Sequence, residues 1–80
     1  MRVLLFGRLR DVAGWREQDI TPPQKTLSAL KAMIAADDSA LAAALQGPGI
    51  QAAVDRTLVR GDVALGPDAE IAFLPPMSGG

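Results

Sequence analysis

The chain has 80 residues, a formal net charge of −1, no cysteine and no histidine. This composition excludes disulfides, the commonest zinc ligands, a thiolate nucleophile and an imidazole base. A domain this small has a thin core, so we expect it to need a partner subunit and to have no self-contained active site, metal or bound cofactor. Basic and acidic residues are interspersed and the opening apolar run is short. We therefore expect a soluble, cytoplasmic protein that binds neither nucleic acid nor membrane.

The first predicted element is a strand over residues 2–9, rich in branched and aromatic side chains. Both of its faces are apolar, because Val3 and Leu5 point one way and Leu4 and Phe6 the other. A thin domain covers only one such face well. The other face is therefore expected to bind a partner.

The next elements are predicted as a strand, a helix and a shorter helix. The strand covers residues 15–20, returns as a hairpin and ends before a proline pair, because proline cannot donate to a ladder. Thr26 is the expected N-cap of the main helix. Its apolar residues recur at helical spacing: Leu27, Leu30, Met33 and Ile34. Ser39 is the expected cap of the short helix over residues 40–45.

Two short strands are expected at residues 50–54 and 58–59. Asp55 suits the turn between them, because its side chain can bond to the local backbone. After two further turn signals, residues 70–74 form the last predicted strand, which is also apolar on both faces.

This order predicts an α+β fold, a mixed sheet with one main helix packed on one face and a short second helix. The main helix is expected to cover one apolar set: Val3, Leu5, Ile71 and Phe73. The opposite set stays uncovered and marks an interface: Leu4, Phe6 and Leu74.

The predicted domain, residues 1–74, is followed by an extended tail, residues 75–80. Two prolines hold the tail away from the sheet, and Gly79-Gly80 carry the carboxylate with no side chain in the way. A frayed terminus is the alternative. A carboxylate reacts only once activated, for instance as an acyl-adenylate, and attack by a sulfur donor then leaves a nucleophilic thiocarboxylate. Because the chain offers no other reactive group, the C-terminal carboxylate is predicted to be the group that reacts.

Three segments together resemble a known family. Residues 3–11, 53–59 and 68–80, the last with its proline pair shortly before Gly-Gly, resemble the small subunits of molybdopterin synthase. That family belongs to the ubiquitin-like β-grasp superfamily of sulfur carriers. The resemblance covers essentially the whole chain and implies a β-grasp fold.

The resemblance also implies a reaction cycle. An E1-like adenylating enzyme uses ATP to adenylate Gly80, and a sulfur donor protein converts the product to a thiocarboxylate. Inside the large synthase subunit the tail donates sulfur to cyclic pyranopterin monophosphate, and two rounds form the dithiolene of molybdopterin. The chain is then an enzyme only as the sulfur-donating subunit of a heterotetrameric sulfurtransferase. Gly80 is the reacting residue, and Gly79 is needed to thread the tail.

The family's docking positions match residues of this chain, with two prolines leading into the tail: Phe6, Arg10, Leu58, Leu74, Pro75 and Pro76. Asp55 stands where the family commonly has asparagine, which leaves any role of that amide open. Three other interpretations stay open: a thiazole-pathway sulfur carrier, a ubiquitin-like protein modifier and a plain interaction domain.

Overall fold

The first and last strands lie side by side at the centre of a five-stranded sheet in the computed structural model, which describes residues 1–76. The strand order is β2-β1-β5-β3-β4, and β1 and β5 are parallel whereas the other pairs are antiparallel. The strands are β1 (Arg2–Leu5), β2 (Glu17–Asp19), β3 (Gln51–Val54), β4 (Thr57–Val59) and β5 (Glu70–Leu74). The helices are α1 (Arg8–Ala13), α2 (Leu27–Ile34) and α3 (Ser39–Leu45).

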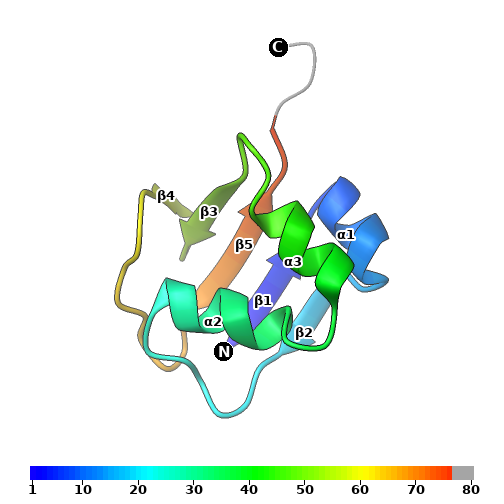
Figure 1. Cartoon of the computed structure of the whole chain (residues 1–80). Helices are drawn as coiled ribbons and strands as arrows, with labels where there is room; N and C mark the ends of the chain where they lie inside the picture. The colour runs from blue at the N-terminus through cyan, green and yellow to red at the C-terminus, as the bar shows by residue number, and fades with distance from the viewer. Residues whose placement is uncertain (77–80) are drawn as a thin grey trace.

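The helices cover one face of the sheet. Figure 1 shows α2 and α3 lying across the central strands, with α1 near the end of β1. The sheet residues beneath them are almost completely buried: Val3, Leu5, Ile71 and Phe73. The helices add Leu9, Leu30 and Leu41 to the same core. The predicted α+β fold, with a mixed sheet and helices on one face, is therefore confirmed.

The prediction of a strand over residues 2–9 is wrong at its second half. The strand ends at Leu5, and Gly7 turns the chain with a φ of 56° into α1. Leu9, predicted to lie in the strand, instead lies in α1, and its side chain is buried in the core. The fold thus has a helix that the sequence pattern did not predict. The connection from β1 to β2 contains this helix, so it is no tight hairpin.

The two helix caps had different outcomes. Thr26 caps α2 as predicted, and its hydroxyl accepts a hydrogen bond from the backbone N–H of Ala29 at 3.2 Å. Ser39 is not the cap of α3, because it is already the first helical residue. The carboxylate of Asp38 caps α3, accepting from the N–H of Leu41 at 2.9 Å.

The strands after α3 are confirmed to within one residue, and the turn at Asp55 has an unexpected partner. Asp55 and Arg56 have φ values of 49° and 71°, the left-handed pair that closes a two-residue hairpin. The Asp55 carboxylate accepts from the backbone N–H of Glu70 at 3.0 Å, so it contacts β5 and not its own turn. An asparagine carbonyl oxygen would accept the same bond.

Candidate docking face and tail root

The sheet has a second face that none of the helices in residues 1–76 covers. Strand pairing aligns Leu4, Ala72, Ala53 and Leu58 in one row across β1, β5, β3 and β4. Leu74 lies on the same face, two residues beyond Ala72, because side chains alternate along a strand. We call the set Leu4, Phe6, Ala53, Leu58, Ala72 and Leu74 the open face.

The open face exposes large apolar side chains. Leu58 is 58% exposed and Phe6 is 45% exposed. The backbone N–H of Phe6 donates to the carbonyl oxygen of Phe73 at 3.2 Å, which places Phe6 beside the end of β5. Water-exposed apolar groups of this size are typical of a surface that a partner covers.

The opposite end of the same face is charged. The Arg2 guanidinium lies 2.9 Å from Glu17 and 3.6 Å from Glu70, on the neighbouring strands β2 and β5. These ion pairs are exposed and add little stability. The open face is therefore polar where β5 begins and apolar where β5 ends.

The tail leaves the sheet at this apolar end. Ladder pairing of β5 stops at Leu74, since Pro75 and Pro76 have no N–H to donate. Pro75 is half-buried and Pro76 is exposed. A groove lined by α1 and α3 opens beside the two prolines. We call Pro75-Pro76 the tail root.

The structure brings some of the predicted site residues together. Phe6, Leu58 and Leu74 share the open face, and the tail root adjoins it. Arg10 lies on α1, where its exposed side chain is 3.9 Å from Asp11, and no hydrogen bond or ion pair within residues 1–76 joins that side chain to the open face. Gly79 and Gly80 lie outside the described residues. The functional roles of all these residues stay predictions.

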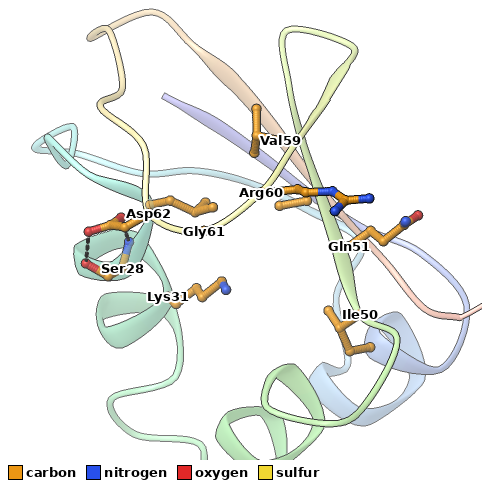
Figure 2. Close-up of a pocket in the computed structure, with 10 residues that line it drawn as sticks. Ser28, Lys31, Ile50, Gln51, Val59, Arg60, Gly61 and Asp62 are labelled. Atoms are coloured by element: carbon orange, nitrogen blue, oxygen red, sulfur yellow. Dashed lines mark hydrogen bonds between the residues drawn. The ribbon is translucent and has the colours of Figure 1, made fainter.

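A second hollow lies between α2 and the β3–β4 edge and contains none of the predicted site residues. Figure 2 shows Lys31 and Arg60 lining it from the helix side and the strand side. The Asp62 carboxylate accepts bonds from the backbone N–H and the hydroxyl of Ser28, both at 2.8 Å. These bonds fasten the β4–β5 loop to the first turn of α2. Asp62 belongs to the first of the two turn signals expected before the last strand, and the sequence did not predict its bonds to Ser28.

The hydrogen bonds to Asp62 predict an acid-sensitive contribution to stability. The backbone N–H of Ser28, and then its hydroxyl, lower the pKa of Asp62 from its ordinary value. A lowered folded-state pKa gives stability that is fully present above about pH 4, the unfolded pKa, and is lost as the pH falls through the folded pKa. Asp62→Asn should therefore lower the melting temperature near neutral pH, and the deficit should shrink as the pH falls below about 4.

Melting temperatures measured from about pH 7 to about pH 3 check this expectation. Asp68→Asn is the control, because the exposed Asp68 carboxylate makes no hydrogen bond or ion pair within residues 1–76. A deficit for Asp62→Asn that stays constant across this range would contradict the assignment.

Residues 1–76 meet neither the requirements of a metal site nor those of a membrane-spanning helix. No group of three or more acidic, histidine or cysteine side chains there is placed to hold a metal ion. None of the helices in this part of the chain has the length and apolarity needed to cross a membrane.

A mixed sheet with helices on one face and a central C-terminal strand defines the ubiquitin-like β-grasp class. Two solved structures share this fold. SAMP1 from Haloferax volcanii superposes with a TM-score of 0.76 and 27% identity, covering 100% of this chain and 98% of that one. A structure of H. volcanii small archaeal modifier protein 1 gives a TM-score of 0.68 and 25% identity, covering 96% and 97%.

Within this class, the chain belongs to the ThiS family, which it matches over residues 3–80. It is 35% identical over 80 residues to the molybdopterin synthase sulfur carrier subunit of Escherichia coli K12, covering 100% of this chain and 99% of that protein. The resemblance inferred from the sequence is thereby confirmed: the chain is related to ubiquitin-like sulfur carriers along its whole length.

Proposed function

We propose that the chain is the sulfur carrier subunit of a molybdopterin synthase and acts in molybdenum cofactor biosynthesis. The observation that carries this proposal is the 35% identity that extends over essentially the full length of both this chain and the E. coli subunit. The open face beside the tail root supports it, because a carrier needs a surface that docks and an end that reacts.

The proposed reacting group is the carboxylate of Gly80. An E1-like adenylating enzyme joins this carboxylate to the AMP portion of ATP and releases pyrophosphate. Sulfur from a donor protein then displaces AMP and leaves a thiocarboxylate. Within the large synthase subunit, this sulfur passes to cyclic pyranopterin monophosphate, and two such transfers form the dithiolene of molybdopterin. Gly79 allows the tail to enter a narrow channel, since it has no side chain.

The division of labour follows from the composition. The chain has no cysteine or histidine, so the thiocarboxylate supplies the nucleophilic sulfur that the side chains lack. The large subunit supplies the pterin pocket, and the whole assembly acts as the sulfurtransferase. We propose that ATP serves only the adenylating enzyme and that this chain binds no cofactor of its own.

The test of the proposal is reconstitution. Thiocarboxylated chain is mixed with a purified large synthase subunit and cyclic pyranopterin monophosphate, and formation of the dithiolene is followed. Conversion is expected, with return of the chain to its carboxylate form. A thiocarboxylated chain that binds the large subunit and leaves the pterin unchanged would contradict the proposal.

The fold alone also fits a protein modifier, as the names of the two archaeal structures indicate. Intact mass measured on protein from its native cell separates the two functions. A carrier shows one terminal oxygen replaced by sulfur, whereas a modifier appears joined to other proteins. A thiazole-pathway carrier would also be thiocarboxylated, and the pterin assay distinguishes it.

The open face predicts a docking-specific mutation. Leu58→Glu places a charge on a side chain that is 58% exposed, so folding should change little. Burying that charge against the large subunit should weaken binding by about 30-fold or more, the effect of losing a hot spot of about 2 kcal/mol. The dissociation constant, measured by calorimetry, checks this expectation.

Met33→Glu is the matched control for this mutation. Met33 is another exposed apolar side chain, 37% exposed, but it lies on α2 and away from the open face. It should leave the dissociation constant unchanged. Equal weakening by both variants would show that the open face has no special part in docking.

A further inference from the structure

One close neighbour of the tail root is Gly7, just after β1. Leu5 pairs with Phe73 in the parallel β1–β5 ladder, so two residues further along each strand Gly7 comes opposite Pro75. A methyl carbon placed on Gly7 would lie 2.7 Å from Cγ of Pro75. Real Cβ atoms essentially never come this close to another heavy atom, so any larger residue at this position would force a shift of the chain or of the proline ring.

The second close neighbour, Gly49, lies on the other side of β5. Gln51 pairs with Leu74 in the antiparallel β3–β5 ladder, so Gly49 comes opposite Pro76. A methyl carbon on Gly49 would lie 2.7 Å from Cβ and 3.3 Å from Cγ of Pro76. The backbone after β1 and the backbone before β3 therefore close on successive prolines from opposite sides.

Local conformation accounts for part of this pattern. Gly7 and Gly49 both have positive φ, 56° and 80°, which favours glycine wherever it occurs. A positive φ alone, however, does not place another residue against the glycine. Gly14 also has a φ of 80°, and a Cβ built there has nothing within 4 Å. The contacts with the prolines are thus a separate feature of the tail root.

We propose that Gly7 and Gly49 are positioning residues that set the direction in which the chain leaves the sheet at Pro76. Neither proline can donate a backbone hydrogen bond to a neighbouring strand, so packing has to hold the tail root in place. Two backbones without side chains, pressed against Pro75 and Pro76, provide that packing. This inference rests on the proposed function, since a direction matters only if the tail has a target.

The consequence is that docking and aiming are separate properties of the molecule. The open face sets how tightly the chain binds its partner, whereas the glycines set where the reacting end arrives. A misplacement of about 1 Å at a reacting group can reduce a rate about 100-fold. A disturbed tail root should therefore slow sulfur transfer while binding stays intact.

The experiment compares Gly49→Ala with Gly14→Ala. Both substitutions place a Cβ on a residue with a φ of 80°, but only the first meets a proline. Each variant is prepared as the thiocarboxylate, and single-turnover sulfur transfer is measured against the concentration of the large subunit. For Gly49→Ala the maximal rate should fall about tenfold or more while the half-saturating concentration changes less than about twofold.

Gly14→Ala should keep the maximal rate of the native chain, and the melting temperatures of both variants show whether they fold. Equal maximal rates for the two variants would overturn the proposal. So would an increase in the half-saturating concentration of Gly49→Ala with no change in its maximal rate.

A second pair of variants keeps the test decisive if Gly49→Ala fails to fold. Pro75→Ala removes the ring atoms Cγ and Cδ that a Cβ on Gly7 would meet at 2.7 and 3.6 Å, and leaves only Cβ at 3.8 Å. Gly7→Ala should therefore slow transfer more in the native background than in the Pro75→Ala background. Equal effects in the two backgrounds would overturn the role of Gly7.

A readout without sulfur chemistry separates this inference from the proposed function. Proton NMR of the unmodified chain should show cross-peaks between the α-protons of Gly49 and the β-protons of Pro76. Missing cross-peaks overturn the positioning role, whatever the chain does. If the cross-peaks are present and the native thiocarboxylate transfers no sulfur, the proposed function fails while the contact stands.

Discussion

Deletion of Gly80 is expected to abolish sulfur transfer while leaving the fold intact. The deletion draws the terminal carboxylate back by about 3.5 Å, the length of one extended residue. Since a misplacement of about 1 Å at the reacting atoms can cost about 100-fold, the transfer rate should fall by at least that factor. Gly80 follows β5 in the sequence, and the buried core described for residues 1–76 is complete without it.

The rate of dithiolene formation with the large subunit measures this effect, and the melting temperature verifies the fold. Ser78→Ala is the control, because it alters the tail without changing its length. A chain extended by one glycine should fail as the deletion does, since its carboxylate is displaced in the other direction. A deletion variant that still transfers sulfur at the native rate would show that the terminal position does not matter.

Phe73→Ala is expected to remove most of the stability of the domain. Phe73 is 0% exposed and lies in the central strand beneath the helices. Replacing such a side chain with alanine costs about 3–5 kcal/mol, from lost burial and the cavity left behind. A typical folded chain of 80 residues has a free energy of unfolding of about 4–12 kcal/mol. The variant should therefore be marginally folded or unfolded.

Urea unfolding measures the free energy of unfolding of the native chain and of the Phe73→Ala variant. The other phenylalanine of the chain, Phe6, provides the control. Phe6→Ala makes the same chemical change at a side chain that is 45% exposed, and its unfolding free energy should change by only about 0.5 kcal/mol. Phe6→Ala should instead weaken binding to the large subunit. A small stability loss for Phe73→Ala would mean that the core does not depend on this strand.

Much of the two-faced sheet could be predicted because strand residues alternate strictly. Once residues 3–6 and 70–74 are strands, their parity determines which side chains face the helices. The alternation alone therefore predicts both the buried set and the exposed Phe6, without any knowledge of how the strands pair. The same logic failed at Leu9, because the turn at Gly7 converts the chain into a six-residue helix too short to show its own periodicity.

The contacts at the tail root could not be predicted, because they depend on the register between strands. Gly7 and Gly49 are far apart in the sequence. Each meets a proline only because the strand beside it, β1 or β3, pairs with β5. The bond from Asp55 to Glu70 has the same origin. Asp55 was predicted as a turn residue from its type alone, whereas its partner in β5 is a property of the folded sheet.

The central position of β5 also has a consequence for how the protein forms. β1 and β3 make no ladder with each other within residues 1–76, and β5 is the strand that joins the β1–β2 pair to the β3–β4 pair. A fragment that ends before β5 therefore has no continuous sheet and no open face. Chains truncated before β5 are therefore expected not to compete for the proposed partner, because the open face forms only when the strand that leads into the tail is in place.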